Sequence, residues 1–375
     1  MKSYVTAFAN PAHNSQVDMP TFVPRTFSRA LDSAPTANGR PEFVLTSPSV
    51  DHVAAVGAGL YAALNASDGG PRTREGARVH YLGTTGRWTG TGFRAWGAPA
   101  PVVEWGAPPT ESWPPQTWAN LVQLAIEPDK EGWIGVSSLS GGEQRDSDAY
   151  LTRVSGGELT HGVRTDRPLT DAFIDANGIV VWSAKGLARY ARPDEPSPSI
   201  FQPSKWKVAK PLFQRAFTDR RRPNAMSGVD GGIAVVGGDS SLAMDTEGEH
   251  SWSTWLLVLD KDGRDRWTAD VPWAVRQPPI EGGGGRVYLA GDRLEALDSG
   301  VSMWSLPAGK RVRATAFSDG GVAITRGSAL QIYSRDGEKL ASFETPDADE
   351  LITPPAIASD GSIWAASAAH LYVGR

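Results

Sequence analysis

The residues with the clearest binding chemistry are three tryptophans in a proline-rich stretch. Trp105, Trp113 and Trp118 lie between positions 97 and 118, where six prolines also occur. Proline holds the backbone extended, and tryptophan offers a broad face that stacks on sugar rings or packs on a protein. These three residues are therefore candidate partner-binding residues. The alternative is that they cover the core within a connection between two sheets.

A basic stretch is the second candidate. The segment from Lys205 to Arg222 carries seven basic residues and one acidic residue, and it ends in Arg220, Arg221 and Arg222. Clustered arginine attracts an acidic partner or a phosphate group. These three arginines are also candidate partner-binding residues, and a solvated loop surface is the alternative.

No segment matches a known catalytic motif. The sequence contains no Gly-x-Ser-x-Gly, His-Glu-x-x-His or Walker loop. The glycines at 282–285 precede an expected strand and not the helix that phosphate binding needs. The run Asp260 to Asp265 alternates carboxylates as a calcium loop does, but it lacks the glutamate at the twelfth position, so a hairpin turn is expected. We predict no cofactor and no metal site, and catalytic residues stay unassigned.

The remaining ionisable residues show no ligand spacing. The six histidines are scattered, although a fold with a central axis can gather distant residues into a histidine–aspartate site. The acidic cluster Asp347, Asp349 and Glu350 is expected to be a solvated turn. Cysteine is absent, which excludes disulfides and thiolate chemistry.

Composition limits the partners. With 37 basic and 42 acidic residues the net charge is −5, which is too balanced to predict nucleic acid as a partner. No window approaches 18 apolar residues, so no membrane insertion is expected. The first residues do not resemble a signal peptide. The expected location is therefore the cytoplasm or a particle.

The elements that must position these residues are short strands joined by tight turns. The same unit recurs: Asp or Asn, then Gly, then a β-branched or aromatic run. Clear copies begin at Asp230, Asp319 and Asp360, and a fourth begins at Asn177. Glycine supplies the positive φ that such a turn requires. Each copy is followed by a second strand and another turn, so a unit holds about four strands.

The spacing of the turns predicts the fold class. The turns at 52, 132, 178, 232, 285, 321 and 361 have a mean spacing of about 51 residues, and four-stranded units of this size are typical of propellers. We predict an all-β protein: a single β-propeller of about seven four-stranded blades, closed by an N-terminal strand. Residues 1–42 form an N-terminal arm and residues 43–375 the propeller. The final unit is one strand short, so Tyr4 to Ala9 or Phe43 to Thr46 is expected to complete it.

Two units resemble a known repeat. Asp260, Gly263 and Trp267 match the Asp-x-x-Gly-x-x-x-Trp ending of the PQQ-like, or quinoprotein-type, β-propeller repeat, and Gly300 and Trp304 match it with one residue deleted. The resemblance implies that the tryptophans pack between blades and that the Asp-Gly pairs make turns. It does not imply the quinone cofactor, because the metal-ligating and stacking residues of the dehydrogenases are not found here.

These observations give two functional hypotheses. The first is a non-enzymatic propeller that docks a protein partner in a larger assembly. The second is a propeller that binds or cleaves a glycan, for example on the surface of a phage tail or virion. Carboxylates converging at one mouth of the axis would favour the second hypothesis, whereas an apolar or charged patch on a rim would favour the first.

Overall fold

The structure is a computed structural model of the chain. It describes residues 16–31, 36–37, 40–41, 50–56, 59–65, 77–82, 88–89, 92–93, 102–105, 118–126, 132–139, 149–155, 158–165, 171–183, 186–192, 208–217, 221–239, 254–351, 353–357, 361–367 and 370–375.

Every regular element within these ranges is a β-strand. The N-terminal part contains β1 (Gln16–Val17), β2 (Phe27–Leu31), β3 (Thr36–Ala37) and β4 (Arg40–Pro41). The first large sheet contains β5 (Val50–Val56), β6 (Gly59–Asn65), β7 (Ala77–Leu82) and β10 (Val102–Trp105), with the small pair β8 (Trp88–Thr89) and β9 (Gly92–Phe93) between them in the sequence. The described residues contain no helix that is long and apolar enough to span a membrane.

The central part of the chain forms three further sheets. The first contains β11 (Trp118–Ile126), β12 (Gly132–Leu139), β13 (Ala149–Ser155) and β14 (Glu158–Thr165). The second contains β15 (Asp171–Asp175), β16 (Gly178–Ser183), β17 (Gly186–Tyr190) and β18 (Phe213–Arg215). The third contains β19 (Arg221–Val229), β20 (Gly232–Asp239), β21 (Thr254–Leu259) and β22 (Asp265–Val271).

The C-terminal part forms the last three sheets. One contains β23 (Ile280–Glu281), β24 (Arg286–Ala290), β25 (Leu294–Asp298) and β26 (Val301–Leu306). The next contains β27 (Val312–Phe317), β28 (Val322–Arg326), β29 (Ala329–Tyr333) and β30 (Lys339–Glu344), with β1 added as a fifth strand. The last contains β31 (Ala356–Ile357), β32 (Ile363–Ala366) and β33 (Leu371–Gly374), with β2 as its fourth strand.

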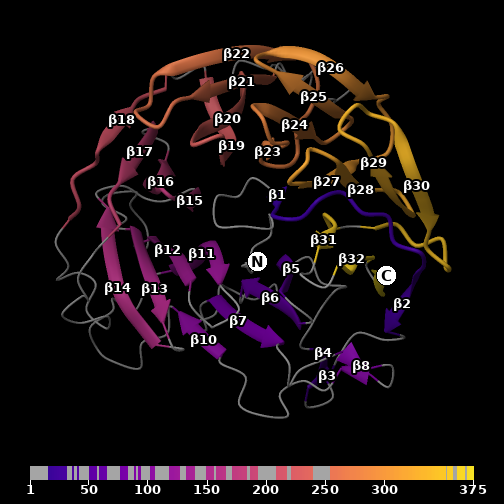
Figure 1. The fold of residues 1–375 in the computed structure, drawn as a ribbon. Helices are drawn as coiled ribbons and strands as arrows, with labels where there is room; N and C mark the ends of the chain where they lie inside the picture. The colour runs from indigo at the N-terminus through magenta and orange to yellow at the C-terminus, as the bar shows by residue number, and fades with distance from the viewer. Residues whose placement is uncertain are drawn as a thin grey trace, which may run out of the picture.

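The large sheets are antiparallel meanders arranged around a common centre. Within each, neighbours along the chain are neighbours in the sheet, apart from the added strands β1 and β2. Figure 1 shows β19, β23 and β27 on the inner side of their sheets and β22, β26 and β30 on the outside. From β11 to β27 the first strands of successive sheets contact one another, β11 contacts β6 and β7 of the first large sheet, and β31 contacts β5. The described strands therefore have the radial architecture of a β-propeller.

The predicted turns form where the Asp-Gly and Asn-Gly pairs occur. Gly178, Gly320 and Gly361 have φ of 137°, 90° and 86°, and Asp230 with Gly231 at φ of 45° and 69° joins β19 to β20. A β-carbon is disfavoured at such angles, which explains the glycines. The run Asp260 to Asp265 is also a turn, with the Asp260 side chain accepting from the amides of Asp262 and Arg264.

The core lies between neighbouring sheets. Each fully described cluster of buried apolar residues takes its members from two successive sheets; one joins Tyr288 and Ala296 to Ala314 and Ile324. The aromatic residues of the outer strands contribute to this contact. Trp304 of β26 stacks on Tyr333 of the next sheet at 6.3 Å between ring centroids, and its indole N–H donates to the Arg335 carbonyl at 2.8 Å. Packing of Trp304 between sheets was predicted and is confirmed.

The outer strand of the last sheet is not either of the two segments expected from the sequence. Strand β2 pairs antiparallel with β33, with Phe27 opposite Gly374 and Ser28 opposite Val373. Tyr4 to Ala9 and Phe43 to Thr46 lie outside the described residues. The physical reason for β2 is its apolar side chain Phe27, which packs on Tyr372 and Phe343 with ring centroids at 5.7 and 6.3 Å.

Candidate functional site

The candidate site is a polar network where the last two sheets meet. The connection from β30 to β31 carries Asp347 and Asp349, and the turn between β32 and β33 carries Ser367 and His370. In an antiparallel meander the connection that enters the first strand and the turn between the second and third strands lie at the same end. We call this end of the sheets the connection face.

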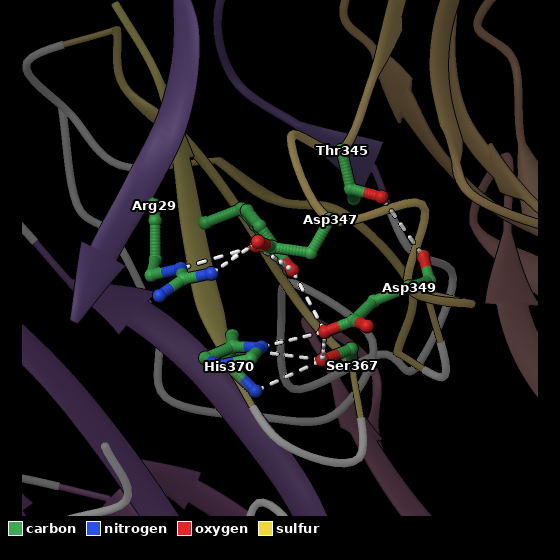
Figure 2. A network of polar contacts seen from close by, with 7 residues as sticks. Arg29, Thr345, Asp347, Asp349, Ser367 and His370 are labelled. Carbon is green, nitrogen blue, oxygen red and sulfur yellow. Dashed lines mark hydrogen bonds and ion pairs between the residues drawn. The ribbon is translucent and has the colours of Figure 1, made fainter. Parts of the chain in front are cut away.

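Asp349 is the centre of the network. Its Oδ2 atom is 2.6 Å from His370 Nδ1 and accepts hydrogen bonds from the Tyr372 hydroxyl at 2.9 Å and the Ser367 hydroxyl at 3.0 Å. Asp347 Oδ2 accepts from Arg29 Nε at 3.1 Å, and Asp347 also forms an ion pair with the same guanidinium. Figure 2 shows the side chains of Arg29 and Asp347, and those of His370, Ser367 and Asp349, pointing toward one another.

Local backbone structure places the two carboxylates on either side of a tight turn. The amide of Ala348 donates to the Thr345 carbonyl at 3.0 Å, and Ala348 has a φ of 57°. The hydroxyl of Thr345 donates to the Asp349 carbonyl at 3.1 Å. Because Thr345 and Leu351 also bond through their amides to the turn between β28 and β29, the connection is held at both ends.

The electrostatics favour ionised carboxylates. Hydrogen bonds from His370 and then Tyr372 lower the pKa of Asp349, and the Arg29 guanidinium lowers the pKa of Asp347. Burial and the adjacent Asp349 carboxylate raise the pKa of Tyr372, so its hydroxyl stays protonated. An ionised carboxylate only accepts hydrogen bonds, so the Nδ1 atom of His370 donates to Asp349. No hydrogen bond joins Nε2 to any residue that the structure describes.

Two kinds of chemistry fit this arrangement. An aspartate that orients a histidine is the arrangement found both in general bases and behind metal-bound histidines. Donor atoms of Asp347, Asp349 and His370 lie within 4.8 Å of one another, a spacing that one metal ion can bridge. The Asp349 oxygen, however, already accepts from three side chains, so the network is complete without a ligand.

The turn predicted at Asp347, Asp349 and Glu350 is present, with Asp347 exposed and Asp349 half-buried, but the two aspartates are not merely solvated. Both are bound to side chains from other elements, whereas Glu350 is exposed. The partners were missed because they are distant in the sequence: Arg29 is 318 residues from Asp347, and His370 is 21 from Asp349. The only local signal is an aspartate pair two residues apart just after a strand.

The structure describes the backbone of four of the six residues that were predicted to bind a partner. Trp113 and Arg220 lie outside the described residues. Trp105 is the last residue of β10, Trp118 the first of β11, and Arg221 and Arg222 are the first of β19. The outer strand of a sheet ends, and the inner strand begins, at the connection face. The backbone therefore brings these four positions to the face that also carries the His370 network.

The outer strand β26 has a different surface chemistry. Val301 is 64% exposed and Met303 is 52% exposed, and Leu340 of the neighbouring outer strand β30 is 43% exposed. In the part of the chain that the structure describes, β26 pairs only with β25, so its outer edge carries no strand. Apolar side chains beside an open strand edge are a surface suited to pairing with another chain.

Comparisons with known proteins do not define a family for this chain. No protein-family model matches the sequence, and no curated protein is significantly similar to it. Among solved structures, Hsv2 of Kluyveromyces lactis is 10% identical with a TM-score of 0.41, covering 83% of this chain and 87% of its own. A virginiamycin B lyase of Staphylococcus aureus is 12% identical with a TM-score of 0.39, covering 69% and 79%.

A third similar structure is regucalcin of Agrobacterium tumefaciens, described as a calcium-binding protein. It is 13% identical with a TM-score of 0.36, covering 64% of this chain and 85% of its own. Similarity at this level carries no functional argument. The chain is an all-β protein of propeller architecture, and that assignment comes from its own sheet order.

Proposed function

We propose that this chain is a non-enzymatic propeller that docks a protein partner within a larger assembly. The observation that carries the proposal is the outer strand β26, which presents exposed Val301 and Met303 beside an open backbone edge. An extended segment of a partner can add to such an edge through main-chain hydrogen bonds, while its side chains cover the apolar positions.

The proposal includes a ring of seven blades closed by β2. It is supported by seven large sheets among the described strands, by the contact between β31 and β5, and by the pairing of β2 with β33. A closed ring leaves inner edges covered and holds the outer strands rigidly, which lowers the entropy lost on docking.

The PQQ-like repeat is part of the same proposal. Its support is a recurring contact in which an outer-strand aromatic lies against the glycine of the turn that precedes the outer strand of the following sheet. Trp267 lies near Gly300, and Trp304 lies against Gly337. In the preceding sheet Phe213 lies against Gly263. This repetition is what the structural roles in that repeat would require.

Affinity capture from the native source tests the proposal. The full-length protein is compared with a Val301→Ser/Met303→Ser variant and with Leu212→Ser as a matched control, since Leu212 is 62% exposed at another place. We expect one stoichiometric protein to be retained by the parent and the control and lost by the double variant. Equal retention by all three rules out docking at β26, and retention of polysaccharide in place of protein supports the glycan hypothesis.

The predicted loop residues are tested in the same experiment. A variant in which Trp105, Trp113 and Trp118 are changed to alanine keeps the backbone of β10 and β11, and a second variant changes Arg220, Arg221 and Arg222 to glutamine. If these residues contribute to docking, each variant retains less partner than the parent does. Full retention by both variants would restrict docking to the outer strand.

A further inference from the structure

Three arginines come together where the inner strand β27 begins. Arg311 precedes β27, and Arg313 is the second residue of the strand. Residues two apart on an extended chain project to the same side. The Arg311 guanidinium donates to the carbonyl of Arg276 at 3.4 Å, and Arg313 Nη1 donates to the carbonyl of Leu351 at 2.9 Å. Arg276, Arg311 and Arg313 are referred to below as the arginine cluster.

The charges in the arginine cluster are not balanced. Arg276 forms an ion pair with Asp292 at 2.8 Å. Neither Arg311 nor Arg313 forms an ion pair with any residue that the structure describes; their charged contacts are with backbone carbonyls. The negative charge of Glu350 raises the pKa of both arginines, and that of Asp292 raises the pKa of Arg311. Neither carboxylate lies within ion-pair distance of Arg311 or Arg313.

The cluster therefore holds like charges in a partly desolvated place. Desolvation is the main cause that lowers the pKa of Arg313 to about 10, and the neighbouring Arg311 lowers it further. Desolvation and then Arg276 lower the pKa of Arg311. Both shifts mean that the folded protein disfavours these positive charges. A bound anion would remove the repulsion and replace the lost solvation.

The arginine cluster lies on the connection face, because it is at the start of an inner strand. Arg221 and Arg222 begin the inner strand β19, so their backbone positions are on that face as well. Guanidinium groups present planar pairs of donors that match the oxygens of phosphate and carboxylate groups.

We propose that Arg311 and Arg313, together with Arg276, form a binding site for a small ligand that carries two or more phosphate or carboxylate charges. The site is independent of docking at β26, which lies on the outer side of the ring. The purely structural alternative is that Arg313 anchors the connection to β31 through the Leu351 carbonyl and that Arg311 has no role.

Calorimetric titration of the full-length protein at low ionic strength tests the site. Inorganic pyrophosphate and citrate are the two probes, and they separate phosphate-bearing from carboxylate-bearing ligands. Arg311→Gln is the main variant, because Arg311 is exposed and makes one long hydrogen bond, so folding should be retained. Arg264→Gln is the matched control, since Arg264 is 79% exposed in the turn before β22.

We expect at least one probe to bind the parent and Arg264→Gln equally, and to bind Arg311→Gln about tenfold more weakly. Arg313→Lys, which keeps the charge and a donor for Leu351, should also bind more weakly without a lower melting temperature. The proposal is overturned if neither probe gives a heat of binding at about 1 mM, a concentration at which weak specific ligands still bind. Equal affinity of the parent and Arg311→Gln, or an equal loss in Arg264→Gln, also overturns it.

Discussion

Asp347 and Asp349 together connect three segments of the chain, one of them more than 300 residues away in the sequence. The Asp349 carboxylate binds His370 and Tyr372 of the final strand region and Ser367 of the preceding turn, while its neighbour Asp347 binds Arg29. These bonds are stronger when the acceptor is ionised. The stability that they supply should therefore depend on pH at the acidic end.

The sign of that dependence follows from the lowered pKa of Asp349 and Asp347. A carboxyl whose pKa is lower in the folded state contributes stability above its unfolded pKa, and the contribution is lost as the pH falls through the folded pKa. We expect Asp349→Asn to be less stable than the parent at pH 6 and to lose less on going to pH 3. Urea unfolding at the two pH values measures this.

Asp262→Asn is the control for the acid experiment. Asp262 is 54% exposed, and its ion-pair partner, Arg264, is 3.9 Å away. Its substitution should leave both the stability at pH 6 and the loss at pH 3 unchanged. If Asp349→Asn shows the same pH dependence as the parent, the network does not contribute to acid stability.

Gly337 provides a second prediction at the scale of single residues. Its φ is 85°, and a β-carbon there would lie 2.7 Å from the indole of Trp304. We expect Gly337→Ala to lower the free energy of unfolding by about 2–3 kcal/mol, from backbone strain and displacement of the tryptophan. Gly285→Ala separates the two causes, because Gly285 has a φ of 83° and no atom within 4 Å of the added carbon.

Chemical denaturation of the two alanine variants gives the comparison. Gly285→Ala should cost about 1 kcal/mol, the backbone part alone. Equal losses in both variants would mean that Trp304 moves aside without cost, and the packing between sheets would then be looser than its burial indicates.

Among the elements, β2 joins the N-terminal part of the chain to its last strand. Besides β33, its segment is fixed by Arg25 and Thr26, whose amides donate to the Arg375 carbonyl at 2.6 and 2.9 Å. Further upstream, Thr21 donates from its amide and hydroxyl to Asp319 at 2.9 and 2.6 Å. Although burial opposes it, the hydrogen bonds from Thr21 lower the pKa of Asp319.

Removal of residues 1–31 should therefore expose the edge of β33. We expect the truncated protein to melt at a lower temperature and to form oligomers, and a synthetic peptide of residues 16–31 to reverse both effects. Size-exclusion chromatography and thermal unfolding with and without the peptide measure this. Removal of residues 1–15 alone is the control that separates their contribution from that of residues 16–31; a stable monomer after removal of residues 1–31 would contradict the prediction.

Local patterns in the sequence predicted the strands and turns. They could not predict which segments far apart in the sequence pair with each other. Turns such as Asp319-Gly320 are encoded by glycine at positive φ, and the placement of Trp304 follows from its position at the end of a repeat. The choice of β2 as the outer strand depends on contacts between Phe27 and residues more than 300 positions away, which no local pattern contains. The Asp349 network was missed for the same reason.

At the scale of the whole molecule, a disulfide bond can be designed between β2 and β33, which pair the first and last parts of the described chain. Ser28 lies directly opposite Val373 in the antiparallel pair of β2 and β33. Opposed residues in such pairs have Cα separations that a disulfide can bridge. Since the sequence has no cysteine, Ser28→Cys/Val373→Cys can form only the designed bond within one chain.

We expect the oxidised double variant to unfold at a higher temperature than its reduced form. The chain-entropy estimate for a loop of this length is on the order of 5 kcal/mol, and measured gains are usually smaller. Mass spectrometry establishes the bond and calorimetry the stability, with Ser28→Cys alone as the control. Failure of the bond to form under oxidising conditions would contradict the pairing of β2 with β33.

The pairing of β2 with β33 also sets an order of events during synthesis on the ribosome. About 340 residues separate Leu31 from its partner Leu371. At roughly 5–20 residues per second, translation leaves β2 without its partner for roughly 20–70 s. The sheets between them can form as they emerge, but the last sheet is completed only after translation of β33. During that interval β2 is a nascent strand that chaperones or a neighbouring chain on the same polysome can capture.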